Sequence, residues 1–216
     1  MDIMNILFNT VNETPYIQNC ESKDVTDINA LSYLVKELTL SQSDKIKLGT
    51  GVERTLEQFI ITNGKDIGWI NIKQKNIKGV KETDHLFVNK KIKLIVYAES
   101  KANLNLDTEK APKTSDKING ITDNLIKETE TIGHEYYGYK VSSNLLGLRY
   151  INSEQIPKVL KTKYRNNSSF GAVNLSSKSE IVGINEYLKI FGFNIIFDDI
   201  GYKKYITHIC VKMFKI

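Results

Sequence analysis

The sequence predicts an α/β (α+β) fold in which helices flank a central mixed β-sheet. Segments with apolar residues at helical spacing are followed by short apolar segments rich in β-branched and aromatic residues, and then by further helical segments. The 216 residues are 41% hydrophobic and 25% charged, a balance typical of a domain that buries a full core. Neither an internal repeat nor a proline-rich or glycine-rich linker divides the chain, so we expect one domain over residues 1–216.

The first part of the chain is expected to be helical. Residues 27–40 carry apolar side chains at spacings that form the stripe of an amphipathic helix. A second helix is expected over residues 51–62, where Val52, Leu56 and Phe59 share one face.

The pattern then changes to that of β-strands. Residues 66–72, 84–88 and 92–98 are short, apolar and rich in β-branched or aromatic side chains. The polar residues 89–91 separate the last two segments and suit a turn. We therefore expect a meander whose last two strands form a hairpin.

The rest of the chain alternates between the two patterns. We expect, in order, a loop over 102–113, a helix over 114–131 that Thr114 or Ser115 caps, a strand over 140–151, a short helix near 153–161, a helix over 177–191, and strands at 193–200 and 205–214. These elements would complete the sheet and the helices on it.

The charge of the chain is mildly positive. Thirty Lys and Arg residues against 25 Asp and Glu residues give a net charge of +5, and because only three of the thirty are arginines, 27 are lysines. Such an excess suits a phosphate-rich partner, and it equally suits an ordinary lysine-rich soluble protein.

Several classes of site are not indicated. Cys20 and Cys210 lie far apart without metal-ligand spacing, which argues against a disulfide framework or a zinc site. His85, His134 and His208 share no metal-binding spacing, and no glycine-rich phosphate loop indicates a nucleotide cofactor. No apolar run reaches the roughly 20 residues of a membrane span, and no signal peptide is recognisable, so we expect an intracellular, cytoplasmic protein without a membrane partner.

Three charged residues stand out at the ends of the predicted hairpin. Asp84 opens one strand, and Glu99 and Lys101 follow the apolar body of the next. Because alternate residues of a strand face the same side, Glu99 and Lys101 project together. Pairing of the two strands would bring Asp84 beside Glu99, so two carboxylates and one ammonium should meet at one end of the sheet.

Two carboxylates at close range repel each other unless a cation lies between them. Hard oxygen ligands select Mg²⁺ or Mn²⁺, and Mg²⁺ is usually held by one or two carboxylates together with phosphate oxygens of a substrate. A metal bound in this way lowers the pKa of its water and stabilises charge that develops on a phosphate. The cluster therefore indicates hydrolysis of a phosphodiester, with Lys101 orienting or deprotonating the attacking water.

These residues resemble the PD-(D/E)xK nuclease superfamily. Asp84 follows Thr83 where the motif has a proline, and Glu99 and Lys101 match Glu-x-Lys at the end of an apolar strand. Residues 96–101 (VYAESK) resemble the site strand of type II restriction endonucleases. The resemblance implies a restriction-endonuclease-like core, metal ligation by Asp84 and Glu99, and products with a 5′-phosphate and a 3′-hydroxyl.

In the same superfamily a helix before the sheet often supplies a further acid. Archaeal Holliday-junction resolvases have a glycine-rich start followed by Glu-Arg-x-Leu, and residues 49–56 (GTGVERTL) resemble it. On a helical wheel Glu53 lies at the edge of the apolar face, next to Ile60, whereas Glu57 is turned further toward solvent. The resemblance implies that Glu53 is a metal ligand and catalytic residue, with Glu57 as the alternative, and it covers residues 45–130.

Residues 131–216 would complete the sheet and contribute DNA recognition or dimerisation. Arg is the favoured reader of guanine, and Asn and Gln are the favoured readers of adenine. Such donors occur in two predicted loops, residues 161–169 and the segment after Lys101. The first can equally be a solvated polar loop that does not contact DNA. The candidate DNA-binding residues are Asn103, Asn105, Lys161, Lys163, Arg165, Asn166 and Asn167.

The residue pattern and the resemblance together indicate a type II restriction endonuclease. It would be Mg²⁺-dependent, with Mn²⁺ as a substitute, and would cleave double-stranded DNA at a specific sequence in a prokaryotic cell. We expect a homodimer, because one site per chain cuts one strand and a two-fold pair cuts both strands of a palindrome. Two alternatives stay open: a Holliday-junction resolvase or repair nuclease of the same superfamily, and a non-catalytic DNA-binding protein with a coincidental acidic cluster.

Overall fold

A computed structural model describes residues 3–19, 42–73, 79–80, 82–105, 110–166 and 173–214 of the chain. The chain folds into two units. The helical unit comprises Met1–Asn63 and Leu188–Ile216, and the sheet unit comprises Gly64–Tyr187. The helix expected over residues 27–40 lies outside the described residues.

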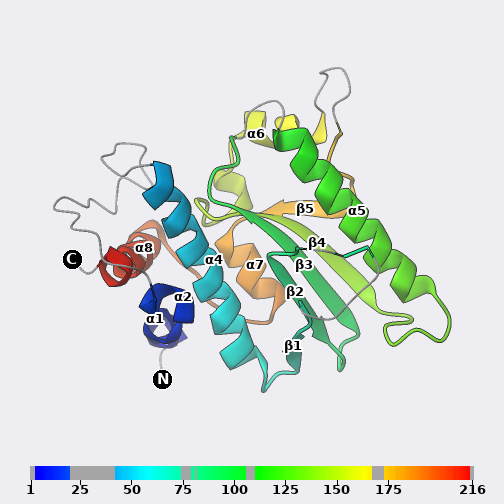
Figure 1. The fold of residues 1–216 in the computed structure, drawn as a ribbon, viewed down its shortest axis with the longest axis horizontal. Coiled ribbons are helices and arrows are strands. Elements are labelled where there is room, and N and C mark those ends of the chain that lie inside the picture. The colour runs from blue at the N-terminus through cyan, green and yellow to red at the C-terminus, as the bar shows by residue number, and fades with distance from the viewer. Residues whose placement is uncertain are drawn as a thin grey trace. The chain divides into compact units, whose positions relative to one another are not determined.

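The described residues of the sheet unit form a mixed sheet of five strands, which are β1 (Trp69–Asn71), β2 (His85–Asn89), β3 (Leu94–Lys101), β4 (Lys140–Gly147) and β5 (Ser179–Val182). The strands follow one another across the sheet in chain order. The pairs β1–β2 and β2–β3 are antiparallel, whereas β3–β4 and β4–β5 are parallel (Figure 1). The predicted fold class, helices on a central mixed sheet, is confirmed.

The β2–β3 hairpin forms as predicted. Within the turn of the hairpin, the side-chain oxygen of Asn89 accepts a hydrogen bond from the backbone N–H of Lys91 at 3.0 Å. This bond stabilises the reversal of the chain. At the other end His85 pairs with Ala98. The register therefore brings Asp84, the residue before β2, to the level of Glu99.

Helix α5 (Lys110–Glu130) lies along one face of the sheet (Figure 1). Its Ile118, Ile121 and Leu125 side chains are buried in one core cluster with residues of β2, β3 and β4. These three residues recur at helical spacing, so the apolar stripe seen in the sequence is the face that packs on the sheet.

The start of α5 differs from the prediction. The helix begins at Lys110, so Thr114 and Ser115 do not cap it but lie buried inside its second turn. Pro112 is compatible with this earlier start because the N–H groups of the first helical turn have no partner within the helix.

A chain of buried hydroxyl groups joins α5 to the sheet. The Thr122 hydroxyl lies 2.6 Å from the Ser143 hydroxyl on β4, which lies 2.8 Å from the Ser179 hydroxyl on β5. All three residues are at most 2% exposed. Each hydroxyl therefore finds a partner within the chain, as buried polar groups require.

The short helix expected near residues 153–161 is two elements. A 3-10 turn, η1 (Ser153–Gln155), is followed by α6 (Lys158–Arg165). Pro157 separates them because proline disfavours the helical conformation of the residue before it.

The helix expected over residues 177–191 is wrong in its first half. Residues Ser179–Val182 form β5, and α7 (Ile184–Ile190) begins only after Gly183. A Cβ atom at position 183 would lie 2.6 Å from the backbone oxygen of Ile151, so the chain passes here too closely for any side chain. The apolar segment was too short for its period to distinguish a buried strand from a helix.

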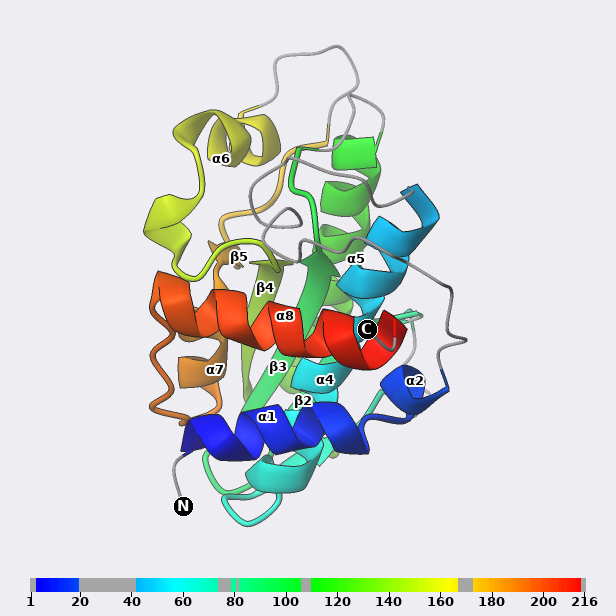
Figure 2. The ribbon, with the colours of Figure 1, turned by 90° about the vertical axis from the view of Figure 1, so that its left-hand side faces the viewer.

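The helices of the helical unit are α1 (Ile3–Glu13), α2 (Pro15–Gln18), α4 (Gln42–Gly64), whose last residue opens the sheet unit, and α8 (Asp199–Phe214), as far as the unit is described. The helix predicted over residues 51–62 is confirmed as the central part of α4. Helices α1 and α8 pack side by side (Figure 2).

The strands expected at 193–200 and 205–214 are wrong. Residues 193–198 have no regular structure, and Asp199–Phe214 is the helix α8. The β-branched and aromatic content of this segment favoured strands, but its buried residues recur three or four positions apart, which is helical spacing. They are Tyr202, Tyr205, Ile206, Ile209, Cys210 and Met213.

Cys210 should be unreactive in the folded protein. It is 1% exposed, and burial raises the pKa of its thiol to about 12, so almost no thiolate forms at neutral pH. In a Cys20→Ser variant, a chromogenic thiol reagent at pH 8 should label Cys210 only after denaturant is added. Stoichiometric labelling of the native variant within minutes would contradict this burial.

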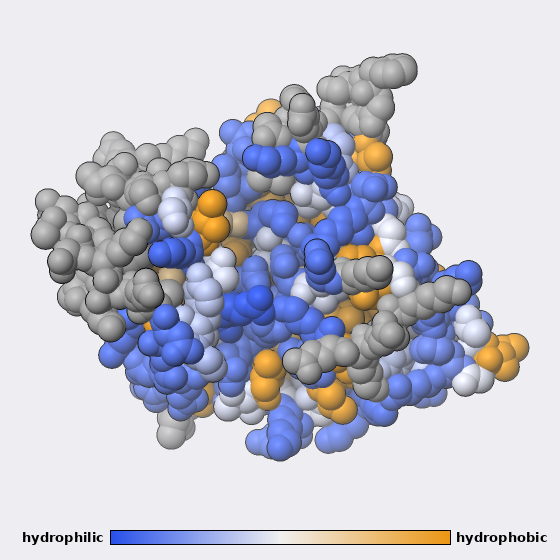
Figure 3. Space-filling view, viewed as in Figure 1, coloured by the Kyte–Doolittle hydropathy of each residue, from blue (hydrophilic) through white to orange (hydrophobic). Residues whose placement is uncertain are grey.

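Hydrophobic side chains on the face shown in Figure 3 form small groups among hydrophilic ones. None of the helices in the described part of the chain combines the length and the apolar character that a membrane crossing requires.

Candidate functional site

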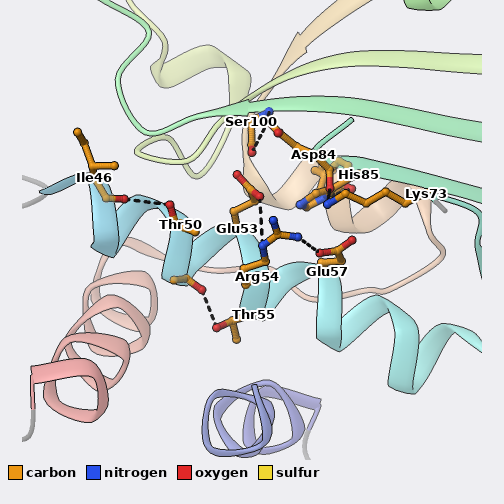
Figure 4. A network of polar contacts seen from close by, with 12 residues as sticks. Ile46, Thr50, Glu53, Arg54, Thr55, Glu57, Lys73, Asp84, His85 and Ser100 are labelled. Atoms are coloured by element: carbon orange, nitrogen blue, oxygen red, sulfur yellow. Dashed lines mark hydrogen bonds and ion pairs between the residues drawn. The ribbon is translucent and has the colours of Figure 1, made fainter. Parts of the chain in front are cut away.

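Asp84 lies just before β2 and reaches across to β3. Its Oδ2 atom accepts hydrogen bonds from the backbone N–H of Ser100 at 2.8 Å and from the Ser100 hydroxyl at 3.1 Å (Figure 4). The hairpin register accounts for this contact, because it brings Asp84 to the carboxyl end of β3. Two donors on one oxygen fix the carboxylate in position.

The Glu99 carboxylate lies between two lysines. Its side chain is only 4% exposed, with Oε1 2.6 Å from Lys101 Nζ and Oε2 2.7 Å from Lys117 Nζ. Lys101 belongs to the same strand, so the predicted shared face of Glu99 and Lys101 is confirmed, whereas Lys117 comes from α5. The two ammonium groups compensate a negative charge that burial alone would penalise.

Tyr97 lies on the same face of β3 as Glu99. Burial raises the pKa of its hydroxyl, and the negative charges of Glu99 and Asp84 raise that pKa further. The register of the hairpin, with His85 opposite Ala98, places Asp84 at the level of Glu99. The structure therefore brings Asp84, Glu99 and Lys101 to one end of the sheet.

A third lysine contacts the cluster through the backbone of Asp84. Lys73, from the segment after β1, donates a hydrogen bond from Nζ to the backbone oxygen of Asp84 at 2.8 Å (Figure 4). Lys101 and Lys117 pair with the Glu99 carboxylate, so lysines from three segments contact residues of the cluster. Such a site favours an anionic ligand, because lysines provide both charge and hydrogen-bond donors.

His85 is a core residue although it adjoins Asp84. Successive strand residues face opposite sides of the sheet, and the His85 ring is fully buried, with Nδ1 in contact with the Tyr187 hydroxyl of α7. This contact supports the backbone on which Asp84 is carried.

The predicted helix acids belong to α4 in the helical unit. Arg54 forms ion pairs with Glu53 at 3.8 Å and with Glu57 at 2.8 Å (Figure 4). The expectation that Glu57 is turned further toward solvent is wrong, since its side chain is 10% exposed and that of Glu53 is 15% exposed. On α4, polar residues outside the apolar stripe are also buried, as the fully buried Thr55 shows, so the stripe alone did not predict the exposure of Glu57. The role of Glu53 stays a prediction.

The loop predicted over 161–169 is wrong in its first part. Lys161, Lys163 and Arg165 lie on α6, Asn166 directly follows this helix, and Asn167 lies outside the described residues. Leu160 and Tyr164 lie four positions apart, and both are buried, so their packing stabilises a helix. The many polar residues of this segment had favoured a loop.

Helix α6 contacts the turn that follows β3. The Tyr164 hydroxyl donates a hydrogen bond to the backbone oxygen of Leu104 at 3.2 Å, and both side chains belong to the same core cluster. Asn103 and Asn105 flank Leu104 and are exposed. Two segments that carry candidate DNA-binding residues, and that are far apart in the sequence, therefore lie beside each other.

Arg165 supports the backbone in this structure. Its guanidinium group donates hydrogen bonds to the backbone oxygens of Leu175, at 3.3 Å, and of Ser176 and Ser179. These bonds tie α6 to the segment that enters β5.

Sequence reasoning missed Lys117, Lys73 and the two donors of Ser100. Lys117 had a signal that was not used: it lies three residues after Thr114 and four before Ile121, and both of these are buried. Residues three and four apart share a helix face, so Lys117 borders the face that packs on the sheet. Lys73 and Ser100 carried no such signal, because their contacts depend on strand pairing.

The donor chemistry of the site fits a hard divalent cation. Carboxylate oxygens of Asp84 and Glu99 are ligands that Mg²⁺ prefers, and Mg²⁺ needs only one or two of them beside water and phosphate oxygens. In the described part of the chain, no three His, Cys, Asp or Glu side chains come together as a metal-binding group. Because Lys101 and Lys117 hold the two oxygens of Glu99, a metal ion would have to replace one ammonium.

Comparison with known proteins identifies no relative: no protein-family model matches this chain, and no curated protein matches it at a significant level.

Proposed function

We propose that this chain is a Mg²⁺-dependent type II restriction endonuclease that hydrolyses phosphodiester bonds of double-stranded DNA. The observation that carries the proposal is the convergence of Asp84, Glu99 and Lys101 at the end of the β2–β3 hairpin. The lysines at Glu99 and at the Asp84 backbone support an anionic substrate, and the mixed sheet flanked by helices agrees with the architecture that the resemblance implies.

Asp84 and Glu99 would hold the metal ion. When bound, Mg²⁺ would supply a water of lowered pKa and stabilise negative charge on the phosphate. Ser100 keeps the Asp84 carboxylate in place through two hydrogen bonds, and burial keeps Glu99 in one orientation. Lys101 would position the attacking water and compensate charge on the phosphate. Attack of this water on the phosphorus would break the bond to the 3′ oxygen and leave a 5′-phosphate and a 3′-hydroxyl.

Sequence recognition and double-strand cleavage would need two further features. A homodimer would supply one site for each strand of a palindrome. The neighbouring segments at Asn103, Asn105 and α6 would reach the base edges, since their donors include amide groups that suit adenine.

The proposal is tested by digestion of supercoiled plasmid with the purified full chain. We expect discrete linear fragments with Mg²⁺ or Mn²⁺ and no cleavage in EDTA. A Glu99→Gln variant, purified in the same way, should leave the plasmid intact, because the neutral amide is a poor ligand for Mg²⁺. This variant also controls for a contaminating nuclease.

Other outcomes would assign the alternatives. Cleavage of a synthetic four-way junction, with the plasmid left intact, would indicate a junction resolvase. Binding of duplex DNA without metal-dependent cleavage of any substrate would indicate a non-catalytic DNA-binding protein. Either result contradicts the restriction endonuclease.

A further inference from the structure

Lys117 reaches the candidate site from α5, whereas Asp84, Glu99 and Lys101 belong to the hairpin. Its Nζ atom lies 2.7 Å from Glu99 Oε2. The Lys117 side chain is 34% exposed and the Glu99 side chain is 4% exposed. The lysine therefore covers a buried carboxylate oxygen while part of its own chain stays in solvent.

A divalent ion needs the same carboxylate that Lys117 neutralises. Lys101 pairs with Glu99 Oε1 at 2.6 Å, and Lys117 pairs with Oε2. If Lys101 stays in place, a metal ion can reach Glu99 only where it displaces the Lys117 ammonium from Oε2. A dication and an ammonium on one oxygen would repel each other strongly in a partly buried site. Lys117 can leave, because its four-carbon stem is flexible and partly exposed.

Lys117 has a natural second partner in the proposed substrate. An ammonium group released from Glu99 stays within the length of one side chain of the site, where the scissile phosphate would lie. Lysine binds phosphate well as a compact charge with three donors. The metal ion would thus replace Lys117 on Glu99, and the released Lys117 ammonium would bind the phosphate.

We propose that Lys117 exchanges partners, holding Glu99 when no metal is bound and contacting a DNA phosphate once a divalent ion holds Glu99. This inference rests on the proposed nuclease function. The exchange makes binding of metal and binding of DNA cooperative, because the metal ion releases the Lys117 ammonium group and the DNA phosphate captures it. Lys117 is a positioning residue in the metal-free protein and a substrate contact in the complex.

The first test measures Mn²⁺ binding to the full chain without DNA, by calorimetry and electron paramagnetic resonance. Lys117→Met should bind Mn²⁺ roughly fivefold more tightly than the wild type, because it removes a partly exposed ion pair that competes for Glu99. Lys117→Arg keeps the charge and should retain the wild-type affinity. Lys127→Met, an exposed position on the same helix, is the matched control and should change nothing. Thermal unfolding verifies that each variant is folded.

The second test measures binding of a labelled duplex over a range of salt concentrations. With Ca²⁺ present, Lys117→Met should lower the slope of log K against log salt by about one relative to the wild type, because one phosphate contact is lost. In EDTA the two proteins should have the same slope, since Lys117 then stays on Glu99. Lys127→Met should follow the wild type under both conditions.

The results separate this inference from the proposed function. If the wild type cleaves plasmid and Lys117→Met binds Mn²⁺ no more tightly, the exchange of partners is overturned and the nuclease stands. If no DNA is cleaved, but Lys117→Met gains Mn²⁺ affinity and loses salt slope only in Ca²⁺, the exchange of partners stands and the proposed nuclease activity fails. Equal loss of salt slope in Ca²⁺ and EDTA would show a permanent phosphate contact and would overturn the exchange.

Discussion

Replacing Lys101 by alanine should abolish DNA cleavage while leaving DNA binding largely intact. Its Nζ atom lies 2.6 Å from Glu99 Oε1, where an ammonium can orient the attacking water and compensate charge on the phosphate. Removing one donor of this kind lowers kcat by roughly 10²–10³-fold. Single-turnover cleavage with Mg²⁺ measures the first effect, and duplex binding with Ca²⁺ measures the second.

Lys90→Ala is the matched control for this prediction. Lys90 lies in the turn at the opposite end of the same hairpin, where it pairs with Glu135 at 2.8 Å and is half exposed. The variant loses the same charge, so a general electrostatic effect on DNA binding would appear in both proteins. Wild-type cleavage by the Lys101 variant would rule out the assigned active site.

Gly183→Ala should destabilise the protein by roughly 2–3 kcal/mol, in the range of strained small-to-large substitutions. The new Cβ would lie 2.6 Å from the backbone oxygen of Ile151 and 2.8 Å from the backbone carbon of Asn152. Backbone atoms here have little freedom to move, because the Ile184 N–H is bonded to the Tyr150 oxygen at 3.0 Å. Chemical denaturation gives the change in the free energy of unfolding.

Gly120→Ala makes the same chemical change with the opposite expected sign. Gly120 lies within α5, and outside the backbone of that helix a Cβ at this position would meet none of the described atoms within 4 Å. Alanine has the higher helix propensity, so this variant should gain roughly 0.5–1 kcal/mol. A Gly183 variant as stable as the wild type would show that the passage between β5 and α7 has room for a methyl group.

The hairpin could be predicted from the sequence because its determinants are local. Two apolar segments and a polar turn specify the pairing, and the pairing alone places Asp84 near Glu99. Helix α8 could not be separated from strands by composition, although the spacing of Tyr202, Tyr205 and Ile209 was helical. Residue type and periodicity disagreed there, and periodicity was the better guide because it reflects which side is buried.

The site was predictable only where one pair of strands builds it. Glu99 and Lys101 share a strand, and their contact follows from alternation. Lys117 enters through the packing of α5 on the sheet, a contact between residues 18 positions apart that no local pattern specifies. Arg165 shows the same limit, because its carbonyl partners become neighbours only when β5 joins the sheet.

The buried hydroxyl groups of Thr122, Ser143 and Ser179 bear on how α5 docks on the sheet. Apolar side chains tolerate a helix that slides or rotates, but a shift of one residue here would break the hydrogen bond between the Thr122 and Ser143 hydroxyls. This bond therefore favours one alignment of helix and strands. Since Lys117 lies five residues before Thr122 on this helix, the same alignment sets the distance at which its ammonium meets Glu99.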